Sequence, residues 1–128
     1  MPAGSLAGRR VLVIDDEEEV RAGTETVLRS WGCDFVGAAD ADGALLAVDG
    51  RAPDAIVADW RLASGATGGD AIARIRGAFG RPIPAVIVSG AGAPDDLARI
   101  KAAGVPLLHK PVAPAKLRST LAFLLGER

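Results

Sequence analysis

Short continuous runs of aliphatic residues recur along the 128-residue chain and are separated by longer amphipathic segments. The clearest runs are Val11–Ile14, Ile56–Ala58 and Val86–Val88, with weaker ones at Phe35–Val36 and around Val105–Leu108. None of these runs alternates with polar residues, which favours strands covered on both faces, as in a parallel sheet. Parallel neighbours need long crossover connections, usually helices, so the runs predict an alternating β–α order.

The segments between the runs carry helical patterns: Val20, Thr24, Val27, Leu28 and Trp31, for example, recur at the spacing of one helix face. The combined pattern predicts strands at 10–14, 34–38, 54–59, 84–88 and 105–109. It predicts helices at 18–31, 41–49, 69–78, 95–103 and 115–125. Five βα units in a chain of this length predict an α/β fold, a doubly wound sandwich with right-handed crossovers.

One domain accounts for the whole pattern. Residues 9–126 are predicted to form it, after a loose N-terminal tail at 1–8. Thr67 and Asp70 have the spacing of a capping box, which predicts a helix start after a flexible loop at Ser64–Gly69.

Composition excludes several classes of protein. Hydrophobic residues make up 49% of the chain and charged residues 24%, which excludes a disordered segment. The net charge is −1, so the basic field of a nucleic-acid-binding domain is absent and no direct nucleic-acid binding is expected. Cys33 is the only cysteine, which excludes an intramolecular disulfide and a multi-cysteine zinc site. The chain lacks an apolar run of the ~20 residues that a membrane span needs. Its start lacks the apolar core of a secretory signal, so a cytoplasmic location is expected.

Polar side chains stand where the predicted strands end. Asp15 and Asp16 follow the first strand and Asp59 ends the third, while Ser89 and Lys110 follow the fourth and fifth. Ligands bind beyond the carboxyl ends of the strands in open α/β sheets, so these side chains are expected to converge at one edge. In a flavodoxin-like strand order, 2-1-3-4-5, the strands that carry the three aspartates are neighbours at the switch point.

Three carboxylates, one hydroxyl and one ammonium group suit phosphoryl transfer. Clustered carboxylates repel one another unless a cation lies among them, and hard oxygen ligands with open positions suit Mg²⁺. The Lys110 ammonium can neutralise one phosphoryl oxygen, and the Ser89 hydroxyl can donate a hydrogen bond to another. A carboxylate beside both cations can attack phosphorus and form an acyl phosphate. Asp59 is the preferred nucleophile because it ends the central strand.

Four motifs, taken in their order along the chain, resemble those of the receiver domain of two-component response regulators. The resemblance is to receivers of the chemotaxis-regulator type. The motifs are Val11–Glu17, Ile56–Trp60, Ala85–Gly90 and His109–Pro111. The resemblance extends over nearly the whole chain, roughly residues 8–125, and the motifs supply all five functional positions of that family.

The resemblance implies how the strand-end residues act. Asp59 is expected to accept a phosphoryl group from a histidine kinase or a histidine phosphotransfer protein, and Ser89 and Lys110 to contact that group. The Lys110–Pro111 peptide bond is expected to be cis. Enzymatic activity is limited, at most, to self-phosphorylation from a phosphodonor and slow self-dephosphorylation.

The resemblance also implies a magnesium site. Asp16, Asp59 and the backbone carbonyl of Arg61 are expected to ligate Mg²⁺ directly, and Asp15 to act through a water molecule.

Two segments depart from the family pattern. Leu107 stands where the family usually has an aromatic residue, so rotation of a Tyr or Phe ring cannot carry the output, and a monomer or weak dimer is expected. The segment Arg61–Gly69 replaces the commoner loop after the phosphoacceptor and is slightly longer. This loop and the Pro106–Pro111 ending resemble receivers fused to the C-terminus of hybrid sensor kinases.

Two other functions compete with the switch. One is a degenerate receiver that serves as a phosphorylation-independent interaction module, and the intact set of five polar residues disfavours it. The other is an aspartate-nucleophile phosphatase, which would need a second acid two residues after Asp59, where Arg61 stands.

Several conspicuous residues have structural interpretations. Glu17–Glu19 suit a helix N-terminus and are assigned to solvent. His109 has no second histidine to form a metal pair and is expected to be structural or exposed. Trp31 is expected to close the core face of its helix, and Trp60 either packs or lies near the mouth of the site.

Overall fold

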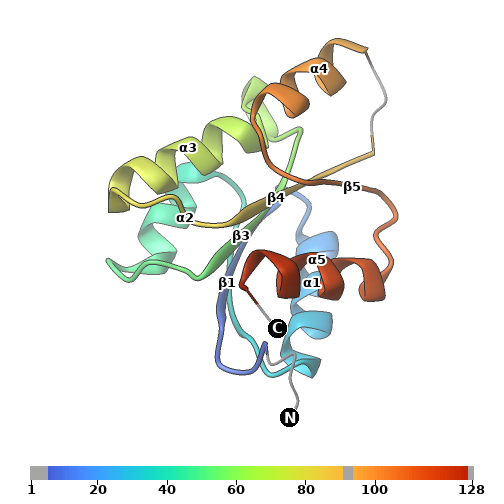
Figure 1. The fold of residues 1–128 in the computed structure, drawn as a ribbon. Helices are drawn as coiled ribbons and strands as arrows, with labels where there is room; N and C mark the ends of the chain where they lie inside the picture. Colours follow the sequence, from blue (N-terminus) through green and yellow to red (C-terminus); the bar gives the residue numbers. More distant parts are fainter. Residues whose placement is uncertain (1–5, 91–93, 127–128) are drawn as a thin grey trace.

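The structure, a computed structural model, describes residues 6–90 and 94–126, with a parallel five-stranded sheet at its centre (Figure 1). The strands are β1 (Arg10–Ile14), β2 (Asp34–Ala38), β3 (Ala55–Asp59), β4 (Ala85–Ser89) and β5 (Leu107–His109). They lie in the order β2-β1-β3-β4-β5, and all neighbouring pairs are parallel. The predicted doubly wound, flavodoxin-like order is therefore confirmed.

Helices cover both faces of the sheet (Figure 1). One face carries α1 (Glu18–Ser30) and α5 (Pro114–Leu124), and the other carries α2 (Ala41–Val48) and α3 (Gly68–Phe79). α4 (Pro94–Ala102) contributes to the same core as α2 and α3 through Ile100. Every helix lies within a few residues of its predicted bounds.

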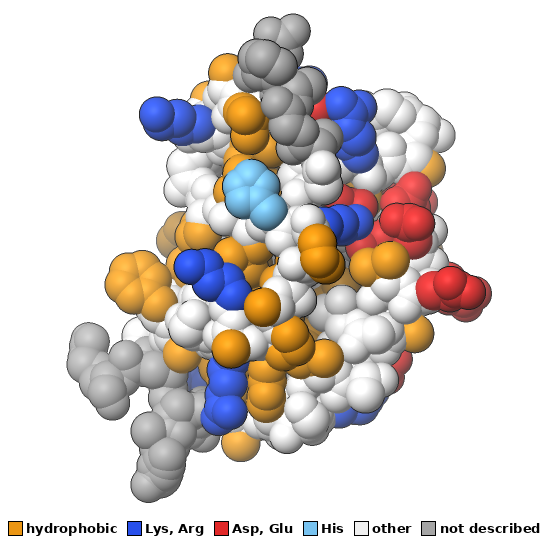
Figure 2. Space-filling view, turned by 90° about the vertical axis from the view of Figure 1, so that its right-hand side faces the viewer, with side chains coloured by type: hydrophobic (Ala, Val, Ile, Leu, Met, Phe, Trp, Pro, Cys, Tyr) orange, Lys and Arg blue, Asp and Glu red, His pale blue; other side chains and the backbone are white. Residues whose placement is uncertain are grey.

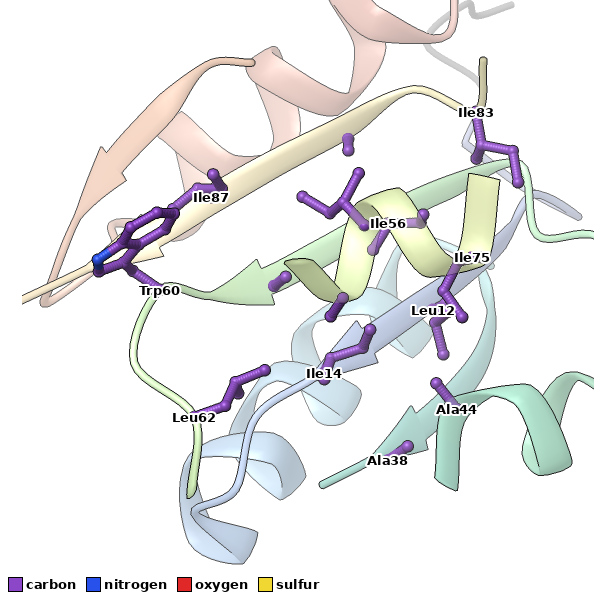
Figure 3. Close-up of a cluster of buried hydrophobic side chains, with 14 of the residues drawn as sticks. Leu12, Ile14, Ala38, Ala44, Ile56, Trp60, Leu62, Ile75, Ile83 and Ile87 are labelled. Atoms are coloured by element: carbon purple, nitrogen blue, oxygen red, sulfur yellow. The ribbon is translucent and has the colours of Figure 1, made fainter. Parts of the chain in front are cut away.

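Alternation along β1 shows how the sheet separates two cores. Leu12 and Ile14 point toward α2 and α3, whereas Val11 and Val13 point toward α1 and α5. This follows from the two-residue period of a strand, which sends successive side chains to opposite faces. Figure 3 shows the α2–α3 core, in which Ile75 of α3 packs over the sheet and Trp60 closes one end.

The fifth strand is shorter than predicted. It begins at Leu107 instead of residue 105, although the carbonyl of Pro106 still accepts a hydrogen bond from the Ile87 N–H. Pro106 has no N–H to donate, so the ladder cannot continue through it in the normal way.

The predicted loop at Ser64–Gly69 is shorter in the structure, because elements occupy both of its ends. It contains a 3₁₀ turn at Ala63–Gly65, and α3 begins at Gly68. The Thr67 hydroxyl caps α3 by accepting a hydrogen bond from the Asp70 N–H at 3.1 Å, as the capping-box spacing predicted.

The predicted loose tail does not extend to Leu6. This side chain is buried in the α1–α5 core, and its carbonyl accepts a hydrogen bond from the Cys33 thiol at 3.5 Å. Cys33 is itself buried, which raises the pKa of its thiol, and its side chain packs as a small hydrophobic residue. Residues 1–5 of the predicted tail lie outside the described residues. None of the helices within 6–90 and 94–126 combines the length and apolar character that a bilayer crossing demands.

Candidate functional site

The sheet brings Asp15, Asp59, Ser89 and Lys110 to one edge. Asp59 ends β3 and Ser89 ends β4, while Asp15 and Lys110 directly follow β1 and β5. Backbone hydrogen bonds hold this alignment: the Lys110 N–H donates to the Ser89 carbonyl at 3.0 Å, and the Trp60 N–H donates to the Val88 carbonyl at 2.8 Å. The convergence predicted from the strand ends is thus present.

Lys110 is the cation at the centre of this edge. Its Nζ lies 3.2 Å from Oδ2 of Asp59 and donates a hydrogen bond to it. The same nitrogen lies 3.9 Å from carboxylate oxygens of both Asp15 and Glu17. Figure 2 shows acidic side chains gathered around a lysine or arginine side chain on this part of the surface. One ammonium group therefore faces three carboxylates.

Burial and charge act against each other at Asp59. Burial raises the pKa of the Asp59 carboxyl, the Lys110 ammonium opposes that rise, and the charges of Asp15 and Asp16 add to it. Burial by itself would lower the pKa of Lys110, but the hydrogen bond and charge of Asp59, with Asp15 and Glu17, raise it overall. Burial, with the added charges of Asp15 and Asp16, thus makes ionised Asp59 costly, and the neighbouring carboxylates keep Lys110 protonated.

Three carboxylates lie close enough together to hold a cation. Ligand oxygens of Asp15, Glu17 and Asp59 lie within 4.8 Å of one another. The Glu17 N–H donates to Oδ1 of Asp15 at 2.9 Å, which turns the chain back and brings the Glu17 side chain toward the site. Hard oxygen donors of this kind, with one face open, fit Mg²⁺.

The members of this carboxylate group differ in part from the predicted ligands. Asp16 is exposed and lies outside the group of three, although its charge still acts on Asp59. Glu17 is exposed, as expected for a residue assigned to solvent, yet its carboxylate also reaches the group. Glu17 could have been recognised from its position two residues after Asp15, because an aspartate at that spacing forms an Asx-type turn.

A small cavity of about 340 Å³ marks the place where a phosphoryl group would fit. Its lining includes Asp59, Ser89, Lys110 and the side chains or backbone of Glu17, Arg61 and Gly90. Ser89 is 1% exposed and belongs to this lining. Carboxylate, hydroxyl and ammonium groups thus share one cavity.

Gly68 lets α3 begin directly behind Asp59. A Cβ atom at residue 68 would overlap the backbone carbonyl oxygen of Asp59, and the Gly68 N–H donates to the Trp60 carbonyl at 2.8 Å. Only glycine permits such an approach of helix to strand end. The position of the Asp59 backbone is therefore fixed by α3 as well as by the sheet.

The two residues after Asp59 take structural positions. Trp60 is 3% exposed and packs in the α2–α3 core (Figure 3), which decides between its two predicted roles in favour of packing. Arg61 lines the cavity, and its side chain forms an ion pair with Asp96 of α4. Asp96 was not predicted as a site residue, because an aspartate in the first turn of a helix is typical of an ordinary helix N-terminus.

A second cavity, of about 510 Å³, lies between α1 and α5 and reaches Asp59 and Lys110 from the other side. Its walls are mostly apolar, and Gly23 leaves open space where another residue would place a side chain. The α1 stripe predicted from the sequence is therefore only loosely packed: Leu28 is its buried member, whereas Val20 is 39% exposed.

The remaining predicted positions lie near β5. Leu107 is partly buried against the α2–α3 core, and His109 is exposed. The Lys110–Pro111 peptide bond is cis, as expected.

A family model for the response regulator receiver domain matches residues 11–122. The chain belongs to this family. Receiver domains are the phospho-accepting switches of two-component response regulators, and they interact with histidine kinases or other phosphodonors.

Curated relatives and solved structures agree with this assignment. The chain is 32% identical over 120 residues to the transcriptional regulatory protein PrrA of Mycobacterium tuberculosis, covering 93% of the chain and 51% of that protein. It is 32% identical over 111 residues to the phosphate regulon transcriptional regulatory protein PhoB of Escherichia coli, covering 85% and 48%. The chain thus spans about half the length of the curated relatives it matches.

Among solved structures, the chain resembles the receiver domain of PhyR from Erythrobacter litoralis, with a TM-score of 0.77 and 28% identity over 94% of this chain and 92% of that one. It also resembles the chemotaxis protein CheY4 of Vibrio cholerae, with a TM-score of 0.80 and 26% identity over 92% and 99%.

Proposed function

We propose that Asp59 is the phosphoacceptor of this receiver domain. The observation that carries the proposal is the Asp59 carboxylate, buried at the end of the central strand and 3.2 Å from the Lys110 ammonium. In the reaction, a carboxylate oxygen of Asp59 bonds to phosphorus as the phosphorus–nitrogen bond of the donor phosphohistidine breaks. The departing imidazole nitrogen keeps the bonding electron pair and takes up a proton from solvent.

Neighbouring groups support each part of this step. Lys110 lies where its charge would offset the negative charge that the phosphoryl oxygens bring, and Ser89 lines the same cavity with a hydroxyl that can donate to one of them. Retention of all these groups also argues against a receiver used only as an interaction module. The phosphodonor we propose is a histidine kinase or a histidine phosphotransfer protein, acting in the cytoplasm on a monomer or weak dimer.

The resident metal that we propose is Mg²⁺, held by Asp16, Asp59 and the Arg61 backbone carbonyl, with Asp15 acting through water. When bound, the ion would neutralise carboxylate charge and polarise a phosphoryl oxygen. The cluster of Asp15, Glu17 and Asp59 oxygens supports a cation at this edge and offers Glu17 as a competing ligand. The increase in melting temperature with Mg²⁺ distinguishes Asp16 from Glu17 as the direct ligand. Asp16→Asn is expected to reduce this increase strongly, and Glu17→Gln only slightly. The reverse order would assign the direct ligand to Glu17.

Phosphorylation is tested with acetyl phosphate and Mg²⁺, followed by intact mass spectrometry. The wild-type protein is expected to gain one phosphoryl group that hydroxylamine removes, and Asp59→Asn none. The matched control is Asp42→Asn, which removes an exposed carboxylate of α2 and should leave phosphorylation unchanged. Equal modification of the wild type and Asp59→Asn would place the nucleophile elsewhere.

A further inference from the structure

The two residues that directly follow β3 both contact α4 through their side chains. Nη2 of Arg61 forms an ion pair with Oδ2 of Asp96, and the guanidinium carbon of Arg99 lies 5.4 Å from the centre of the Trp60 ring. The third attachment of α4 is Ile100, which is 2% exposed in the core. The strand that carries the phosphoacceptor is therefore linked to α4 by side chains.

Arg61 pairs with one anion and lies next to the position of a second. Its guanidinium contacts Asp96, and the residue also lines the cavity that contains Asp59 and Lys110. The Arg61 side chain is 67% exposed, so little packing restricts it to one of these partners. Its position is decided by which anion attracts it more strongly.

The Asp96 side chain, unlike that of Arg61, is largely buried, with only 12% of it exposed. A carboxylate with so little solvent is costly without its counterion, and the cost falls if the group moves into water. Asp96 lies in the first turn of α4, so its movement toward solvent would displace that turn.

We propose that Asp96 is a positioning residue: it holds the Arg61 guanidinium in an ion pair until phosphorylation draws Arg61 toward Asp59. Departure of Arg61 leaves Asp96 without its counterion and frees the first turn of α4. This inference rests on the proposed function of Asp59 and adds the regulation of that site. A phosphoryl group supplies negative charge and acceptor oxygens that favour an arginine partner.

The Arg61–Asp96 pair offers an output path that bypasses Leu107. Leu107 has no ring edge or hydroxyl to change partners, so its orientation gives the phosphoryl group little to act on. The Arg61 guanidinium, in contrast, has two alternative partners, Asp96 and a phosphoryl group on Asp59. We therefore expect α4 to respond while β5 and α5 stay as they are.

Hydrogen exchange of the intact chain, with and without beryllofluoride and Mg²⁺, tests this inference; beryllofluoride stands in for the phosphoryl group. In the wild type, exchange across residues 96–102 should rise at least several-fold with beryllofluoride, and exchange across 107–124 should not. Asp96→Asn and Arg61→Gln should each show the faster α4 exchange without beryllofluoride, and the double variant no more than either. The matched control is Arg74→Gln, which breaks the exposed Arg74–Asp42 pair and should behave as the wild type.

The outcomes separate this inference from the proposed function. If beryllofluoride leaves residues 55–61 of the wild type unchanged, the phosphoacceptor function itself is overturned. If those residues respond but α4 does not, or if the two single variants add in the double variant, the positioning role of Asp96 is overturned. Additive effects would mean that Asp96→Asn acts only by weakening the helix start.

Discussion

The Nζ atom of Lys110 lies closer to Asp59, at 3.2 Å, than to Asp15 or Glu17, at 3.9 Å each. Lys110 therefore forms its hydrogen bond with Asp59 and leaves the other two carboxylates only partly neutralised. The metal-free site therefore carries an excess of negative charge, which affects the stability of variants at Asp59 and Lys110.

Asp59→Asn is expected to stabilise the metal-free protein at pH 7, raising Tm by a few degrees. The folded-state pKa of Asp59 is raised above its usual value of 3.8, mainly by burial. The contribution of this carboxyl to stability is thus fully present below about pH 3.8 and is lost as the pH rises through the raised value. Melting curves of both proteins with a chelator, between pH 7 and pH 4, should show a difference that shrinks toward acid pH. A difference independent of pH would contradict the electrostatic cause.

Lys110→Met is expected to lower the free energy of unfolding at neutral pH by about 1–3 kcal/mol, because it removes a charged hydrogen bond at a largely buried carboxylate. Urea unfolding measures this loss, and added Mg²⁺ should recover part of it. Lys116→Met is the control, since Lys116 lies on an exposed part of α5. An equal loss in both variants would show that the effect does not come from the hydrogen bond between Lys110 and Asp59.

Gly68→Ala and Gly23→Ala are expected to have opposite effects. At residue 68 a Cβ would overlap the Asp59 carbonyl, so this variant should be destabilised and bind Mg²⁺ more weakly. At residue 23, in the middle of α1, no atom lies within 4 Å of the added Cβ, so the variant should gain about 0.5–1 kcal/mol from helix propensity. Chemical unfolding with and without Mg²⁺ checks both. Destabilisation of Gly23→Ala would mean that α1 packs more tightly against α5 than the cavity indicates.

Trp60 fluorescence should report occupation of the site. Trp31→Phe leaves Trp60 as the single tryptophan, with its ring in the core under the Arg99 guanidinium. Because Trp60 directly follows Asp59, the proposed phosphoacceptor, and contacts α4, its emission should change when beryllofluoride and Mg²⁺ are added. Asp59→Asn in the same background is the control and should show no beryllofluoride response. An unchanged spectrum in Trp31→Phe would count against movement of α4 relative to β3.

The sequence predicted the order of elements well because local signals agreed with one another. Continuous aliphatic runs such as Val11–Ile14 favour strands buried on both faces, and four of the five predicted strands end in polar residues at the same edge. The loop after Asp59 was predicted less well. Its glycines indicate freedom in the unfolded chain, whereas Gly68 is required by a contact with the Asp59 backbone that no local pattern contains.

The sequence predicted which strand-end residues form the candidate site, but it did not predict the contacts that Glu17 and Arg61 make around them. Asp59, Ser89 and Lys110 follow from strand ends alone, and the family resemblance added their roles. The approach of Glu17 to the carboxylate group depends on a two-residue turn, and the pairing of Arg61 with Asp96 joins residues 35 positions apart. Contacts of this range arise from tertiary packing, which propensity and periodicity do not encode.

The contact between Gly68 and the Asp59 backbone also limits how a signal can leave this domain. With α3 directly behind Asp59, Val88 of β4 paired with it and Ala58 paired with Ile14 of β1, the main chain at Asp59 works as a rigid anchor. Chemistry at such an anchor cannot be transmitted by sliding the strand. It must pass through groups that project beyond the anchor, so the identities of Trp60 and Arg61 determine which outputs this receiver can drive.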